Sequence, residues 1–311
     1  MVVMKKRIIP LFLMALLLFA ICLMSPTSAR NTYDERIFQM AQRSTESLSE
    51  DDYNHNIAIK ELETGSYRIT LDGVTYLISN NDDQIVITND SFIKEDVSIV
   101  TDEYLIRIFE RAKSNVVKYV TSSTIIKDAD KEQIENNIWS IELYSGSFVL
   151  DESVKNTLTD EELKSIGEIV AIYEDGSVYI NSSKTAKVTE FVLTHELFHY
   201  VSEVTNNGLE NQDYSYSIIT EVITDFLAVT SAPPAVDIAD TSYLSSYEDV
   251  LLYINVYKKD ALRAYFYGYD EIWKKAGKDN FDFFVYCLDN SQNSFCKDCT
   301  KIMVIKLKKD L

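Results

Sequence analysis

Two of the three histidines in this chain, His195 and His199, are four residues apart, and Glu196 directly follows the first of them. On an α-helix, side chains at positions i and i+4 lie on one face, about 6 Å apart along the axis. The preceding segment has helical spacing too, because Val188 and Val192 fall on the same face as the two histidines. The pair therefore predicts a helix that presents both imidazoles to one point.

The glutamate between the histidines adds a chemical group to this face. Glu196 is turned by about 100° from His195, so it can lie beside an ion that both imidazoles bind without binding it. A carboxylate in that place can take a proton from a water molecule that the metal activates. Residues 195–199 match the H-E-x-x-H zinc-hydrolase motif. We therefore predict a Zn²⁺ site with Glu196 as general base.

Catalytic zinc sites use three protein ligands, so a third one must come from elsewhere. The metzincin arrangement would need glycine at position 202 and histidine at position 205, where this chain has Ser202 and Thr205. No histidine occurs further along, and the one other histidine, His55, stands alone in a polar stretch and is assigned no role, which leaves Asp or Glu. An apolar helix is predicted over residues 218–229, and in it Glu221 and Asp225 are again four apart. One of the two is expected to bind zinc while the other accepts a ligand histidine's free ring N–H.

The combination of HELFH with a downstream E-x-x-x-D helix resembles the gluzincin metallopeptidases, the thermolysin-like clan. The resemblance covers roughly residues 178–229. It implies that His195, His199 and Glu221 bind Zn²⁺ and that Asp225 is the partner of His195. It also implies an α+β, zincin-like catalytic domain of two lobes. One lobe would contain a mixed sheet and the active-site helix, and the C-terminal lobe would be helical.

One part of the thermolysin-like site has no counterpart in this chain. Those enzymes use a downstream histidine to stabilise the tetrahedral oxyanion, and a tyrosine or arginine must replace it here. The candidates are Arg263, Tyr265 and Tyr267 in a helical stretch over 251–267, with Tyr214 and Tyr216 in the loop between the two site helices as rivals. Because the chain contains 20 tyrosines, position alone does not single one out.

The first 29 residues have the pattern of a secretory signal. A basic start at residues 5–7 precedes an uncharged apolar run over 8–24, and small residues lead to a cleavage site after Ala29. The apolar run is at the short limit for a membrane span, so an uncleaved N-terminal anchor is the alternative. We expect a secreted protein with no other contact with a membrane.

Removal of this segment would change the formal net charge from −19 to −22, because Lys5, Lys6 and Arg7 are lost. Such acidity argues against nucleic acid as a partner, since phosphates require a basic surface. It also argues against adhesion to anionic lipids. The expected partner is a peptide or protein substrate, and the acidity fits the solubility of a secreted protein better than steering of cationic substrates.

The remaining chain of about 280 residues has room for one large domain or two modest ones. Period-two patterns over 67–71, 74–79 and 85–88 predict a small antiparallel meander. It could be a substrate-binding module, a pro-region or an edge of the main sheet. The predicted divisions are a signal peptide at 1–29, a β-containing N-terminal region at 30–100, and a zinc metallopeptidase-like catalytic domain at 101–311.

Local patterns predict several further elements. These are a helical patch at 34–44 in a loose lead-in, an amphipathic helix over 102–121 capped by Thr101 or Asp102, a short helix opening at the capping box 159–162, and a hairpin of strands 169–173 and 177–181 around Asp175-Gly176. An exposed strand edge just before the motif helix could hold an extended peptide beside the metal.

Three cysteines remain after signal removal, Cys287, Cys296 and Cys299. In an oxidising compartment we expect one disulfide and one leftover thiol, with the pairing open. The single C-x-x-C lacks the four ligands of a second zinc site.

The function predicted from these patterns is a secreted zinc endopeptidase. A zinc amidase or esterase acting on cell-surface material is the first alternative, because it would use the same site chemistry. A non-catalytic secreted zinc-containing binding protein is the second, although a structural site would use four protein ligands and no base.

Overall fold

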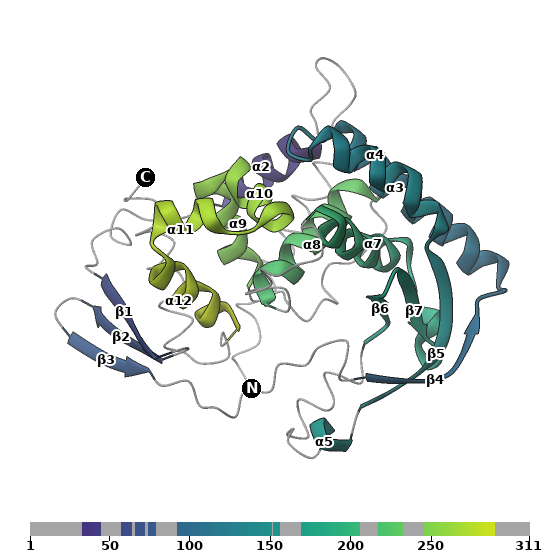
Figure 1. Cartoon of the computed structure of the whole chain (residues 1–311), viewed down its shortest axis with the longest axis horizontal. Helices are drawn as coiled ribbons and strands as arrows, with labels where there is room; N and C mark the ends of the chain where they lie inside the picture. Colours follow the sequence, from purple (N-terminus) through teal and green to yellow (C-terminus); the bar gives the residue numbers. More distant parts are fainter. Residues whose placement is uncertain are drawn as a thin grey trace, which may run out of the picture.

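The structure is a computed structural model, and it describes residues 33–44, 57–63, 66–71, 74–78, 92–150, 152–155, 169–205, 217–232 and 246–289. Helices and two separate sheets occur along these residues, which confirms the predicted α+β class. Helices α7 (Glu190–Thr205) and α8 (Ile218–Ser231) lie centrally in Figure 1, with a four-stranded sheet on one side and the C-terminal helices on the other.

The four-stranded sheet has the order β4-β5-β7-β6, formed by Phe92–Ile99, Glu142–Leu150, Ser177–Asn181 and Ala171–Glu174. β5 and β7 are parallel, and the two outer pairs are antiparallel. The predicted hairpin is confirmed as β6–β7, and its turn residues Asp175 and Gly176 both have positive φ, at 49° and 74°. Two positive φ angles give the turn that matches strand twist. Among the described strands, β6 is an edge strand next to the motif helix.

The sheet extends across the predicted boundary at residue 100, because β4 lies before that boundary and pairs with β5. A second sheet is formed by β1 (Ile57–Glu63), β2 (Ser66–Leu71) and β3 (Val74–Ile78). Its antiparallel order β1-β2-β3 confirms the first two strands of the predicted meander and adds β1 before them. The predicted strand 85–88 lies outside the described residues. In the described part of the chain this meander is a sheet of its own and not an edge of the main one.

Helix α3 (Glu103–Ser122) supports the motif helix along its length. The side chain of Asp102 accepts the N–H groups of Tyr104 and Leu105 at 2.8 and 3.0 Å. Of the two predicted candidates, Thr101 and Asp102, the helix cap is therefore Asp102. The apolar face expected of this amphipathic helix is buried and includes Leu105, Ile108, Phe109, Ala112 and Val116. After α3 come α4 (Asp128–Asn137), the 3-10 turn η4 (Ile138–Ser140), α5 (Glu152–Lys155) and η5 (Ser182–Lys187). The capping box at 159–162 lies outside the described residues.

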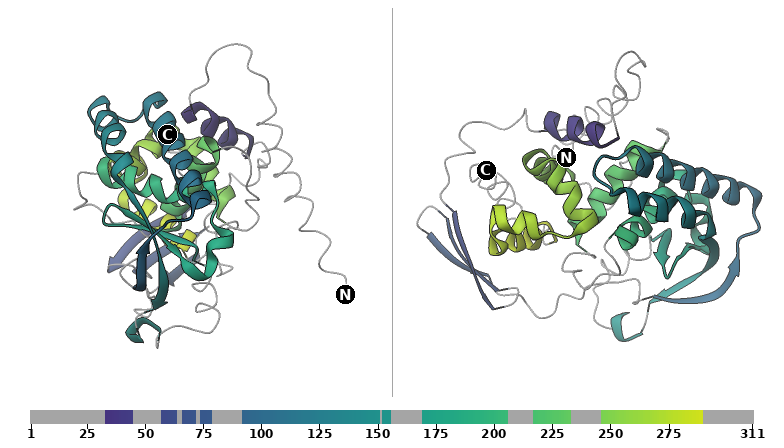
Figure 2. Two further views of the ribbon diagram at one scale, coloured as in Figure 1. Left: turned by 90° about the vertical axis from the view of Figure 1, so that its right-hand side faces the viewer. Right: turned by 45° about the horizontal axis from the view of Figure 1, so that its top comes forward.

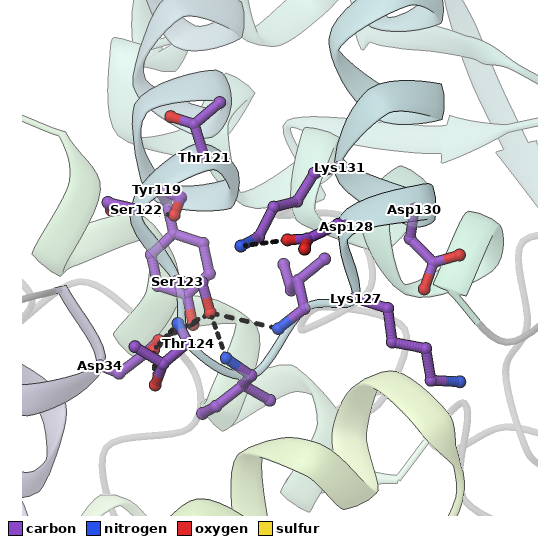
Figure 3. Close-up of polar contacts among 12 residues, drawn as sticks. Asp34, Tyr119, Thr121, Ser122, Ser123, Thr124, Lys127, Asp128, Asp130 and Lys131 are labelled. Atoms are coloured by element: carbon purple, nitrogen blue, oxygen red, sulfur yellow. Dashed lines mark hydrogen bonds and ion pairs between the residues drawn. The ribbon is translucent and has the colours of Figure 1, made fainter.

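The first described helix, α2 (Tyr33–Ser44), confirms the predicted helical patch but is not a loose lead-in. It packs against α8 and α9 (Tyr247–Tyr257), and its apolar face is buried. Figure 3 shows Asp34 of this helix at the C-terminal end of α3, where its carboxylate accepts hydrogen bonds from the Tyr119 hydroxyl at 2.8 Å, the Ser123 hydroxyl at 3.1 Å and the Thr124 N–H at 2.8 Å. The segment is therefore part of the core.

Residues 246–289 are helical and form α9, α10 (Lys259–Tyr267), α11 (Asp270–Ala276) and α12 (Lys278–Asp289). The single helix predicted over 251–267 is two helices, because Lys258 adopts φ +50° and ends the first. Gly268 and Gly277, both at positive φ, end α10 and α11. Cys287 is buried in α12, while Cys296 and Cys299 lie outside the described residues. Among the described helices, none has the length and apolar character needed to cross a membrane.

Candidate metal centre

The motif helix α7 is fixed at its first turn by α3. Glu190 accepts a hydrogen bond from the Asn115 side chain at 2.7 Å and forms an ion pair with Arg111 at 2.9 Å. A carboxylate at a helix N-terminus is also favoured by the helix dipole. Because α7 begins at Glu190, residues 195–199 lie in the middle of a regular helix, as the predicted motif requires.

Helix α8 is placed by burial and brings two acidic side chains to α7. Its apolar residues are almost fully buried: Ile219, Val222, Ile223, Phe226, Leu227 and Ala228. At its N-terminus, Asp289 of α12 accepts the N–H of Ile218 at 2.8 Å, which satisfies one of the free donors of the first turn. Glu221 and Asp225, one turn apart on this helix, contact His195 of α7.

Three side chains form a cluster with metal-ligand chemistry. One ligand atom each from His195, His199 and Glu221 lies within 4.8 Å of the others. The two histidine Nε2 atoms are 3.1 Å apart, Glu221 Oε2 is 3.2 Å from the Nε2 of His195, and Glu221 Oε1 is 3.6 Å from that of His199. Ligand atoms about 2.0–2.2 Å from a tetrahedral ion would be about 3.3 Å apart. The cluster thus fits one small divalent ion.

The nearly buried carboxylate of Asp225 fixes the orientation of His195. Its Oδ1 is 2.7 Å from the Nδ1 of His195, and because a carboxylate only accepts hydrogen bonds, Nδ1 carries the proton. The lone pair of the neutral ring is then on Nε2, which faces Glu221 and His199. This is the outer partner that a metal-binding histidine usually has.

The electrostatics of the cluster favour a cation. Burial lowers the pKa of His195, but the Asp225 and Glu221 carboxylates outweigh it and raise this pKa well above its ordinary value. Burial raises the pKa of Glu221, and the two histidines outweigh it and hold this pKa well below its usual range. The acid is therefore ionised and the imidazole attracts a second proton. A divalent ion that binds here would displace that proton.

Glu196 is buried between α7 and the sheet. Its Oε2 accepts the backbone N–H of Tyr173 on β6 at 2.8 Å, so the edge strand holds one oxygen of the carboxylate. Burial raises the pKa of Glu196, although the neighbouring imidazoles of His195 and His199 oppose the shift. A carboxylate with a raised pKa is a stronger proton acceptor near neutral pH.

The three residues predicted for the oxyanion are occupied elsewhere or exposed. The Tyr265 hydroxyl is buried between helices, 2.8 Å from Thr224 Oγ1 and 3.2 Å from the carbonyl of Phe198. The Tyr267 hydroxyl donates to Asp130 at 2.6 Å and accepts the Lys127 N–H at 2.8 Å. Arg263 is exposed on α10, and the rivals Tyr214 and Tyr216 lie outside the described residues.

Two groups that the sequence did not indicate contact the site. One is the backbone N–H of Tyr173, which bonds Glu196. The other is the hydroxyl of Tyr247, the first residue of α9, which donates to Oδ2 of Asp225. The hairpin pattern offered a signal for the first, since it placed an edge strand before the motif helix. Tyr247 carries no sequence signal among so many tyrosines.

Comparison with known proteins gives no matching family, no matching curated protein and no matching solved structure. Any interpretation of the site therefore depends on its own residues. These are the cluster of His195, His199 and Glu221, the adjacent carboxylate of Glu196, and the partner Asp225.

Proposed function

We propose that this chain is a secreted zinc-dependent endopeptidase of the gluzincin type. The observation that carries the proposal is the cluster of two imidazole Nε2 atoms and one ionised carboxylate at tetrahedral separations, with a second buried carboxylate beside it. Two histidines and one glutamate are a ligand set of catalytic zinc, whereas structural zinc sites use four protein ligands. His195, His199 and Glu221 would hold the ion.

The chemistry divides among these side chains. A zinc ion at this place would polarise the substrate carbonyl and lower the pKa of a water molecule towards about 7. Glu196 would accept a proton from the attacking water and deliver it to the leaving amine nitrogen. The Tyr173 N–H holds one oxygen of the Glu196 carboxylate, and Asp225 holds a proton on Nδ1 of His195, so that Nε2 is the ring atom that faces His199 and Glu221.

The arrangement of the elements supports a two-lobed, zincin-like domain. In Figures 1 and 2 the four-stranded sheet and α9–α12 lie on opposite sides of the site helices. This arrangement is the one expected if one lobe contains the sheet, the other is helical, and the site residues lie at their junction. β6, an edge strand among those described, bonds Glu196 and suits main-chain pairing with an extended peptide.

The alternatives differ in the substrate and in the use of Glu196. An amidase or esterase acting on cell-surface material would share every residue of the site. A non-catalytic binding protein would want a fourth protein ligand, and the described part of the chain provides three in this cluster. It would also have no use for a buried carboxylate of raised pKa beside the ion, so the endopeptidase is the better explanation.

The decisive experiment incubates the secreted chain with a diverse peptide library, with and without a zinc chelator. We expect cleavage inside peptides, its loss with the chelator, and its return when Zn²⁺ is added. Cleavage that resists the chelator would contradict the metal mechanism. Hydrolysis of amide or ester probes without cleavage of any peptide would favour the first alternative.

A second prediction concerns the third ligand. Glu221→Ala is expected to weaken Zn²⁺ binding by at least about 100-fold, because it removes a ligand and not merely an outer partner, whose loss already costs 10- to 100-fold. Metal content after dialysis measures this. Glu135→Ala, at an exposed acidic residue on α4, is the matched control and should keep its zinc. Unchanged metal content in Glu221→Ala would place the third ligand elsewhere.

A further inference from the structure

Asp225 makes one hydrogen bond through each of its two carboxylate oxygens. Its Oδ1 lies 2.7 Å from His195 Nδ1, and its Oδ2 accepts the hydroxyl of Tyr247. Both Asp225 and Tyr247 are buried, with 2% and 0% of their surfaces exposed, so solvent water is not at hand to replace a lost partner. The chain of contacts therefore runs from α9 through α8 to the candidate metal ligand on α7.

A buried carboxylate with a single donor can turn about its Cβ–Cγ bond, whereas a second donor on the other oxygen fixes its plane. The Tyr247 ring is itself held, because it packs edge-on against Phe226 with ring centroids 5.0 Å apart and an interplanar angle of 87°. Its hydroxyl thus reaches Oδ2 from a rigid base. A neutral donor also leaves the negative charge of Asp225 available to His195, which a cationic partner would reduce.

We propose that Tyr247 is a positioning residue of the metal site: it holds Asp225 in the plane that keeps the proton of His195 on Nδ1 and its Nε2 directed at the ion. The inference rests on the proposed zinc site. It adds Tyr247 as a residue that contacts Asp225, which in turn contacts the proposed ligand His195. Outer partners of metal-binding histidines fix ring orientation and raise ligand basicity. The hydroxyl of Tyr247 extends that role to a helix that supplies no ligand.

A purely structural role would need only the ring. The aromatic ring of Tyr247 fills the space against Phe226, and phenylalanine would fill it equally well. The hydroxyl is the part that acts on Asp225. Tyr247→Phe therefore separates the two roles, since it preserves the packing and removes the donor.

The test measures zinc affinity of the full secreted chain by competition with a chromogenic chelator. Tyr247→Phe is expected to weaken Zn²⁺ binding by about tenfold, at the low end of what loss of an outer partner costs. The control is Tyr253→Phe, which removes a hydroxyl from a fully buried tyrosine on the same helix and should bind zinc like the wild type. Thermal unfolding of both metal-free variants checks that they fold, and the visible spectrum of the Co²⁺ form reports the ligand geometry, which should change only in Tyr247→Phe.

A double-mutant cycle with Asp225→Asn completes the design. If Tyr247 acts through Asp225, then Tyr247→Phe should cause no further loss of zinc affinity in the Asp225→Asn background. Equal zinc affinity and Co²⁺ spectra in Tyr247→Phe and wild type would overturn the inference alone, as would losses that multiply independently in the double variant. A wild-type chain that binds no zinc would overturn the proposed function and the inference together.

Discussion

Replacing Glu196 by glutamine is expected to lower the kcat of peptide hydrolysis by about a thousandfold while the zinc content stays the same. General-base catalysis by a positioned carboxylate contributes about 10²- to 10⁴-fold, and an amide of the same shape cannot accept the proton. The amide oxygen can still accept the N–H of Tyr173, so the contact with β6 is kept. Glu196 is not one of the three clustered ligands, so metal binding should persist.

The measurement needs kcat on a peptide selected from the library, together with metal analysis of the same sample. Glu132→Gln makes the identical chemical change at an exposed position on α4 and is expected to retain wild-type activity. Full activity in Glu196→Gln would refute the mechanism. Loss of zinc in that variant would instead show that Glu196 maintains the metal site itself.

Local spacing explains why so much of the candidate site could be predicted from the sequence. His195, Glu196 and His199 lie within five residues, where the helix period alone determines their directions. Glu221 and Asp225 are related by the same period within a second helix. The structure brings the two helices together and distinguishes the two acidic residues. Glu221 faces both histidines, and Asp225 is bonded to the other ring nitrogen of His195, Nδ1.

Groups that act on the site across tertiary distances could not be predicted in this way. Tyr247 reaches Asp225 from a helix that begins 22 residues later in the chain. The oxyanion candidates have in common only their position in a helical stretch. In the structure the hydroxyl of Tyr265 bonds Thr224 and that of Tyr267 bonds Asp130. Neither fact has a local pattern, because the partner of a buried hydroxyl is decided by packing.

The fold shows the same division between local and tertiary information. The β6–β7 hairpin follows from the turn residues Asp175-Gly176, whose backbone preferences are local. Strand β4 was not predicted, because Asp96 at φ +52° and a register shift between Glu95 and Ser98 interrupt the two-residue period. The helix over 251–267 was predicted unbroken, since a lysine at positive φ gives no sequence signal such as Gly268 gives.

The polar composition of the N-terminal segment led to a wrong prediction for the residues of α2. A stretch of mixed polar composition predicted a loose lead-in, whereas α2 buries Ile37, Met40 and Ala41. Asp34 is 1% exposed, yet the Tyr119 hydroxyl, the Ser123 hydroxyl and the Thr124 N–H donate hydrogen bonds to its carboxylate (Figure 3). An acidic residue in a polar stretch reads as solvated, and only the tertiary structure reveals the donors that allow its burial.

Asp34→Ala is consequently expected to lower the free energy of unfolding by about 3–5 kcal/mol. The substitution leaves the buried hydroxyls of Tyr119 and Ser123 without their acceptor, and each buried unpaired donor costs about 1–3 kcal/mol, whereas the Thr124 N–H belongs to an exposed residue and can bond water. Urea unfolding of the metal-free secreted chain measures the change. Gln39→Ala, at an exposed position of the same helix, should stay within about 0.5 kcal/mol of the wild type.

The same substitution should reach the metal centre, because Tyr119 packs edge-on against Phe198 of the motif helix with ring centroids 5.2 Å apart. Helix α2 also contacts α8, which carries Glu221, and α9, which carries Tyr247. Loosening α2 should therefore weaken zinc binding, whereas Gln39→Ala should not. An Asp34→Ala chain as stable as the wild type, with unchanged zinc affinity, would show that α2 contributes neither to the stability of the fold nor to the candidate metal site.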